Sequence, residues 1–196
     1  ALVSSDGLQK SGAGTLALTS VSSYGGGTTV NQGTLELRGA FGGTSLINGA
    51  VTVNSGASLA LTNGDGTGFG WSNTISSLTI NGGSVNASGG AHLGFGSYVN
   101  VSMSGGSSIS GSWQWNGDSL LGFSSSGDST NSISGNLVLR ADAGANHSFN
   151  VANGAAATDL QVNAVLSDQW PEVNWVPASA LVKAGAGTME VNASNS

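Results

Sequence analysis

The sequence predicts an all-β protein in which short strands coil around a narrow apolar core. Runs of strand size alternate apolar and polar residues, as in residues 15–18 and 34–37, and this period of two is typical of half-buried strands. Gly, Asn and Ser separate the runs every few residues, as tight turns require. Residues 181–191 repeat residues 8–18 almost position for position, and an internal copy of this kind indicates a repeat architecture.

The alternating runs continue along most of the chain. They lie at residues 15–18, 28–30, 34–37, 45–47, 50–53, 58–61, 75–80, 84–87, 98–103, 107–110, 135–139 and 148–151. Asn-Gly spacers between runs could also close antiparallel hairpins. The runs are shorter than typical hairpin strands, however, and suit a coil of triangular section with roughly 20 to 25 residues per turn, or about eight or nine stacked turns.

One segment differs in composition from the rest. Residues 166–180 hold both prolines and two of the 5 tryptophans, with almost no glycine, so we expect a loop or an excursion from the coil. We therefore divide the single elongated domain into a solenoid at 1–165, this loop at 166–180, and the first half of a second repeat copy at 181–196. The best helical candidate, residues 155–161, is short.

The composition excludes several classes of function. Charged residues make up 7% of the chain, against about 25% in ordinary globular proteins, so Ser, Thr and Asn must supply the polar surface. With four basic residues and a net charge of −6, we expect neither nucleic acid nor an anionic membrane as a partner. No apolar stretch of about 18 residues is present, and we expect no direct membrane insertion. The absence of Cys excludes disulfides and thiolate sites.

The first copy of the repeat carries a dense motif. Its marker residues are Leu8, Lys10, Gly12, Gly14, Thr15, Leu16, Leu18, Tyr24, Gly26, Gly27, Thr28, Thr29, Val30, Gly33, Thr34, Leu35 and Leu37. This pattern resembles the autotransporter-associated β-strand repeat of type V secreted passengers. The resemblance implies a right-handed parallel β-helix within a protein that is extracellular or on the outer surface of a Gram-negative bacterium. It implies no catalytic residues, and it accounts for the missing cysteines, because passengers that cross a pore unfolded avoid them.

Candidate catalytic and metal-binding residues do not form complete sets. Ser119, in Gly-Asp-Ser-Leu, matches the tetrapeptide of an esterase family, but those enzymes place an Asp three residues before the catalytic His. Here Asp142 precedes His147 by five residues, and His92 has no acidic residue near it. We therefore expect no enzyme. The two histidines lack metal-ligand spacing and are expected at the surface or in turns, so we expect no cofactor and no metal.

Trp113 and Trp115 are the candidate ligand contacts. They are separated by one residue, so on a strand they share a face. If that face points outward, the two indoles form a platform for host or surface glycans or for a protein partner. If it points inward, they are large core residues at a wide turn of the coil.

The two ends of a solenoid are the other candidate interaction surface. An end turn leaves backbone groups and apolar side chains without a neighbour, and head-to-tail contacts between copies propagate as filaments. The candidate self-association residues are Leu2, Leu16, Leu18, Leu181, Met189 and Val191. We expect first a structural or adhesive segment of a secreted bacterial surface protein. A self-assembling subunit of an extracellular filament or sheath is second, and a GDSL-like esterase is a remote third.

Overall fold

The fold consists of short parallel strands stacked in two sheets. The computed structural model describes residues 5–39, 44–64, 66–68, 75–93, 99–116, 122–140, 146–168 and 180–193. The first sheet contains β1 (Leu8–Lys10), β3 (Thr28–Val30), β5 (Gly49–Asn54), β7 (Ile75–Asn81), β9 (Asn100–Ser104), β11 (Phe123–Ser126), β13 (Asn146–Val151) and β15 (Ala180–Ala184). The second contains β2 (Thr15–Leu18), β4 (Gly33–Arg38), β6 (Ala57–Asn63), β8 (Ser84–Leu93), β10 (Ser108–Asn116), β12 (Asn131–Arg140), β14 (Leu160–Asp168) and β16 (Met189–Val191).

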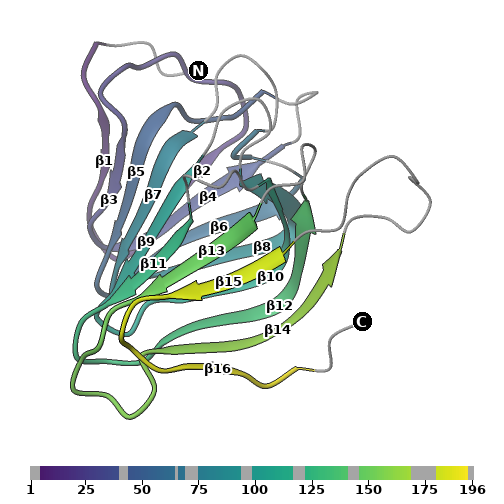
Figure 1. Ribbon diagram of the computed structural model, residues 1–196. Helices are drawn as coiled ribbons and strands as arrows, with labels where there is room; N and C mark the ends of the chain where they lie inside the picture. Colours follow the sequence, from purple (N-terminus) through teal and green to yellow (C-terminus); the bar gives the residue numbers. More distant parts are fainter. Residues whose placement is uncertain are drawn as a thin grey trace.

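The strand order defines a coil. Odd-numbered strands form one 8-stranded sheet and even-numbered strands form the other, so each turn of the chain adds one strand to each sheet (Figure 1). All pairings between these strands are parallel, for example Thr15 to Leu18 of β2 beside Thr34 to Leu37 of β4. The prediction of a parallel β-solenoid is thereby confirmed, and the hairpin alternative is wrong for the described strands. The right-handed sense of the coil stays a prediction.

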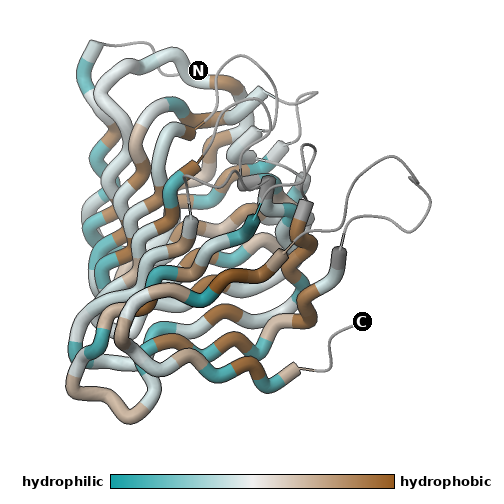
Figure 2. The backbone as a smooth tube through the Cα atoms, in the orientation of Figure 1, coloured by the Kyte–Doolittle hydropathy of each residue, from teal (hydrophilic) through white to brown (hydrophobic). Residues whose placement is uncertain are grey.

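The apolar core fills the space between the two sheets. Apolar and polar residues alternate along the strands (Figure 2), and buried and less buried residues alternate in the same way, as in β5 and β6. Leu35 and Leu37 are fully buried, and Leu18, which pairs with Leu37, is buried as well. Leu16 is only partly buried, because it belongs to the first turn and is covered by strands on one side. The sequence-based placement of these four leucines inside the coil is therefore confirmed, with Leu16 at its margin.

The glycines of the repeat allow successive turns to approach closely. Gly33 has φ of +69°, a left-handed conformation that side chains disfavour. A Cβ at Gly33 would also overlap the backbone of Gly12 to Gly14 in the preceding turn. Gly14, by contrast, has open space where its Cβ would lie. The two glycines of the same motif therefore carry different constraints.

Two local predictions need correction. Residues 155–161 contain no helix: residues 155–159 are bends and irregular backbone, and residues 160 and 161 already belong to β14. The Asp159 carboxylate accepts backbone N–H groups at this turn of the chain. The loop expected at 166–180 begins later, since β14 runs to Asp168 and β15 already starts at Ala180. Residues 169–179 lie outside the described residues. In the described part of the chain, no helix is long and apolar enough to cross a membrane.

The alternation of faces gives a direct test of the fold on one strand. Leu78 of β7 is fully buried, whereas Ser76 on the same strand is exposed. We expect Leu78→Asp to lower the free energy of unfolding by about 3 kcal/mol or more, because an apolar core offers the carboxylate no partner. We expect Ser76→Asp to change it by no more than about 0.5 kcal/mol. Urea denaturation followed by circular dichroism measures both, and equal effects would contradict the assigned faces.

Candidate interaction surfaces

Trp113 and Trp115 point into the core. Their side chains are 2% and 1% exposed, so the interpretation of an outward platform for glycans or proteins is wrong. On β10, Trp113 lies between Ala91 of β8 and Leu137 of β12. The small alanine leaves room for an indole within the narrow space between the sheets. The Trp113 Nε1–H donates to the carbonyl of Ser110 at 2.9 Å, which satisfies the one polar group of the ring.

Trp115 organises an aromatic cluster inside the later turns of the coil. Its ring centroid lies 4.6 Å from that of Phe123 and 5.4 Å from that of Phe149, both edge to face. His147 lies 4.7 Å away and is fully buried, with its Nε2 at 2.9 Å from the Trp115 carbonyl oxygen. The expectation that His147 lies at the surface or in an exposed turn is therefore wrong. The His147 side chain points inward from β13, and the ring of Trp115 packs against it.

The other predicted site residues are not brought together in the described part of the chain. Ser119, Asp142 and Leu2 lie outside the described residues. The half-buried His92 lies in β8, at the opposite sheet from β13, which carries His147. Among the described residues, no group of three or more His, Asp or Glu side chains could hold a metal ion.

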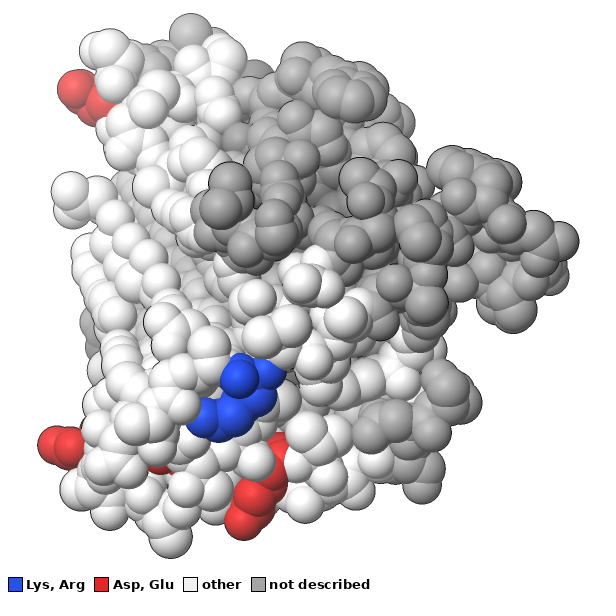
Figure 3. Space-filling model, in the orientation of Figure 1, with Lys and Arg blue, Asp and Glu red and all other residues white. Residues whose placement is uncertain are grey.

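The outer surface is built from stacked hydroxyl and amide groups. The side chain of Asn54 donates to Asn31 at 2.8 Å, Asn81 donates to Asn54 at 3.4 Å, and Ser104 donates to Asn81 at 3.2 Å. Successive members are 23, 27 and 23 residues apart, or one turn of the coil. Charged side chains are sparse on the described part of the face of the molecule that Figure 3 shows. The ladder satisfies polar groups between turns without using ionic pairs.

A second polar ladder runs inside the corner that leads into the second sheet. The Ser107 N–H donates to the side-chain oxygen of Asn131 at 2.9 Å, and the Asn131 N–H donates to the Asp159 carbonyl at 3.2 Å. All three residues are buried. The Asp159 carboxylate in turn accepts the N–H groups of Gly154 and Thr188, both at 2.8 Å. Sequence reasoning missed this ladder, although a polar residue directly before an apolar run recurs at all three positions.

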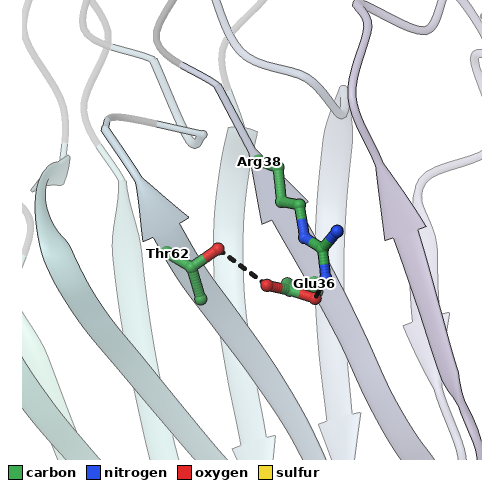
Figure 4. A network of polar contacts seen from close by, with 3 residues as sticks. All are labelled: Glu36, Arg38 and Thr62. Atoms are coloured by element: carbon green, nitrogen blue, oxygen red, sulfur yellow. Dashed lines mark hydrogen bonds and ion pairs between the residues drawn. The ribbon is translucent and has the colours of Figure 1, made fainter.

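Glu36 forms the one ion pair among the described residues. Its carboxylate lies 2.6 Å from the Arg38 guanidinium and accepts the Thr62 hydroxyl at 2.8 Å from the next turn (Figure 4). These contacts, with that of Arg38 the larger, lower the pKa of Glu36 below its usual value. Glu36 thus ties β4 to β6 at the surface.

The first copy of the repeat shows how one turn covers another. The Lys10 ammonium is buried and donates to the carbonyls of Ser11, Gly12 and, from the following turn, Gln32. Tyr24 is also buried, and its hydroxyl lies 2.6 Å from the Thr28 hydroxyl. Burial raises the pKa of Tyr24, and the bond to Thr28 opposes part of that shift.

The second copy forms the last turn of the stack. Leu181 of β15 and Val191 of β16 are 41% and 40% exposed, while Met189 is partly buried against the core. Among the described residues no strand pairs with the outer edge of β15 or β16. Of the proposed self-association residues, Leu181 and Val191 are thus exposed at one end, and Leu16 and Leu18 are covered by the turn that follows them.

The lowered pKa of Glu36 gives a pH-dependent test. Because the pKa of Glu36 is lower in the folded than in the unfolded protein, its ionised carboxylate adds to the free energy of unfolding at pH values above the unfolded-state pKa. This contribution is lost as the pH falls through the folded-state pKa. We expect Arg38→Gln to raise the pKa of Glu36 toward its usual value, and Thr62→Val to raise it less, because the Arg38 bond has the larger effect. Titration of the Glu36 carboxyl carbon by NMR measures the pKa. A value that both substitutions leave unchanged would contradict these contacts.

Comparison with known proteins agrees with the motif. Residues 8–37 match the family model described as the passenger-associated-transport-repeat, which confirms the resemblance to autotransporter passenger repeats. The matched segment contains β1 to β3 and most of β4, the first two turns of the coil. No curated protein and no solved structure matches the chain. The match makes residues 8–37 similar to a repeat of autotransporter passengers, within a chain that folds as a β-solenoid.

Proposed function

We propose that the chain is a stiff structural segment of a secreted bacterial surface protein, which holds itself or attached modules away from the cell and takes part in adhesion. The observation that carries this proposal is the passenger repeat at 8–37, located on the first turns of a coil that continues through eight strands in each sheet. A scaffold of this kind needs length and rigidity and no catalytic centre. We assign Ser119 no catalytic role and expect the chain to have no hydrolase activity.

The core supports a rigid role. Inward columns of mainly apolar side chains run from turn to turn in the described strands, with buried Thr28 and Ser125 as polar members. Because the packed interior is continuous along the stack, bending the coil would open contacts between successive turns. The aromatic cluster around Trp115 adds edge-to-face contacts in the later turns, and such contacts contribute about 0.5 to 1.5 kcal/mol each beyond burial.

The surface supports an extracellular role. Hydroxyl and amide ladders such as Asn31, Asn54 and Asn81 do not depend on ionic pairs, so salt weakens them little. The absence of Cys leaves no disulfide that could form before export. Both properties suit a chain that crosses two membranes and then works outside the cell.

Surface display tests this function. With a secretion signal before the chain and an outer-membrane translocator after it, we expect Gram-negative cells to display a folded coil that resists protease. Gly33→Val should leave the displayed chain protease-sensitive, because a side chain there would overlap the preceding turn. Gly14→Ala is the matched control, since its Cβ enters open space. Retention inside the cell, or display without protease resistance, would contradict the proposal. Immunoblotting after protease treatment of intact cells gives the readout.

End-to-end assembly is a second candidate function. The exposure of Leu181 and Val191 on the last turn favours it, because apolar side chains beside open strand edges promote pairing with another chain. In this candidate the first turn of another copy covers the last turn, and the contact propagates as a filament.

Light scattering over rising protein concentration tests end-to-end assembly. We expect the apparent mass to rise with concentration, and Leu181→Ser together with Val191→Ser to abolish the rise. Val165→Ser is the control, since Val165 is 38% exposed but lies on β14, in the turn before the last strands. A strictly monomeric chain, or equal loss of assembly in the control, would count against this candidate.

A further inference from the structure

We infer that Asn48 is a modification site, at which the side-chain amide is lost by reaction with the backbone nitrogen of Gly49. The reaction needs only the folded chain and water, so it is independent of the proposed function. The fold selects Asn48 for this reaction and protects other asparagines that have the same neighbour in sequence.

An asparagine that precedes glycine has a reactive group on each side of one short ring. The backbone nitrogen of the glycine attacks the side-chain Cγ, a C–N bond closes a cyclic imide, and the Cγ–Nδ2 bond breaks. The proton of the backbone N–H leaves with Nδ2 as ammonia. Water then opens the imide at either carbonyl and gives aspartate or isoaspartate. Glycine favours the attack because it has no Cβ beside the nitrogen.

The chain offers matched examples of this pair. Asn48, Asn81 and Asn153 each precede a glycine. For all three pairs the structure gives a hydrogen-bond acceptor of the glycine N–H, and the three acceptors are of different kinds. The local chemistry is therefore equal, and the surroundings of the nitrogen differ.

At Asn48 the acceptor is the reacting side chain itself. The Gly49 N–H donates to the Asn48 Oδ1 at 2.8 Å. Because Oδ1 is bonded to Cγ, this contact holds the attacking nitrogen beside the carbon that it must reach, and such positioning accelerates ring closure. Gly49 has φ of +77°, so the fold favours glycine at this position and thereby maintains the reactive pair.

At Asn81 both reacting groups are held by other turns of the coil. The Gly82 N–H donates to the Ser104 carbonyl at 2.7 Å and to the Ser107 hydroxyl at 2.9 Å. The Asn81 side chain donates to Asn54 and accepts the Ser104 hydroxyl. Ring closure would require all these bonds to break, so the fold slows the reaction here.

At Asn153 the nitrogen is bound to a carboxylate. The Gly154 N–H donates to the Asp159 Oδ1 at 2.8 Å, and the Asn153 Nδ2 lies 3.4 Å from the Gly154 carbonyl oxygen. The nitrogen attacks after it loses its proton, and a negative charge beside the Asp159 carboxylate disfavours that loss. This pair is therefore protected as well.

Modification at Asn48 would alter the corner that leads into β5. Ile47 and Val51, on either side of the pair, are fully buried in the core. Isoaspartate adds one carbon to the main chain between them, so the two side chains can no longer both keep their places in a close-packed interior. Either product also places a carboxylate at a half-buried position. The reaction therefore loosens the start of β5.

Incubation of the folded chain in mildly alkaline buffer made with heavy-oxygen water tests the inference, because opening of the imide incorporates oxygen from the solvent. Peptide mass spectrometry measures the rate at each pair. We expect Asn48 to react about tenfold or more faster than Asn81 and Asn153 in the folded chain. In concentrated urea we expect the three rates to converge, since each pair then has only its local chemistry.

Asn48→Gln is the control variant, because its side chain keeps the amide but would have to close a larger ring. We expect it to remove the reaction at position 48 and to leave the rates at Asn81 and Asn153 unchanged. Equal rates at the three pairs in the folded chain, or a slower rate at Asn48, would overturn the inference. So would a preference for Asn48 that persists in urea, because it would come from the local sequence and not from the fold. These rates are compared within one sample of the unaltered chain, so the outcome does not depend on the folding of the variant.

Discussion

Each turn of this protein is stabilised by the turns directly before and after it, and the rest of the structure depends on this constraint. Strand spacing in a parallel sheet is about 4.8 Å, so every inward side chain must fit between two neighbours in the same column. The columns are mainly apolar, the corners carry glycine or buried polar groups, and the surface carries stacked amides and hydroxyls. Among the described strands, β15 and β16 pair on one side only, and Leu181 and Val191 are exposed there.

Much of the fold follows from the period-two pattern. Residues 15–18, 34–37, 50–53 and 58–61 all lie within strands, and the internal copy correctly indicates stacked turns. Eight strands in each sheet agree with the expected eight or nine turns. The pattern is informative because each strand buries one of its faces. Two residues that are two positions apart on a strand lie on the same face, so apolar residues at this spacing indicate the buried face.

The candidate site was harder to predict because the same pattern does not say which face is inside. Trp113 and Trp115 share a face in either arrangement, and only the neighbouring Ala91 and Leu137 show that this face is the core. His147 is buried for a similar reason, since the ring of Trp115 packs against it from the opposite sheet.

The polar corner formed by Ser107, Asn131 and Asp159 has a consequence for how the chain finds its alignment. A slip of one residue between neighbouring strands exchanges the two faces and is strongly disfavoured, but a slip of two residues preserves the alternation of apolar and polar side chains. The hydrophobic columns therefore discriminate poorly against that error. A two-residue slip would separate the Ser107 N–H from Asn131 and the Asp159 carboxylate from Thr188, and would leave buried polar groups without partners. These few hydrogen bonds therefore favour the native strand register over registers shifted by two residues, which bury nearly the same apolar side chains.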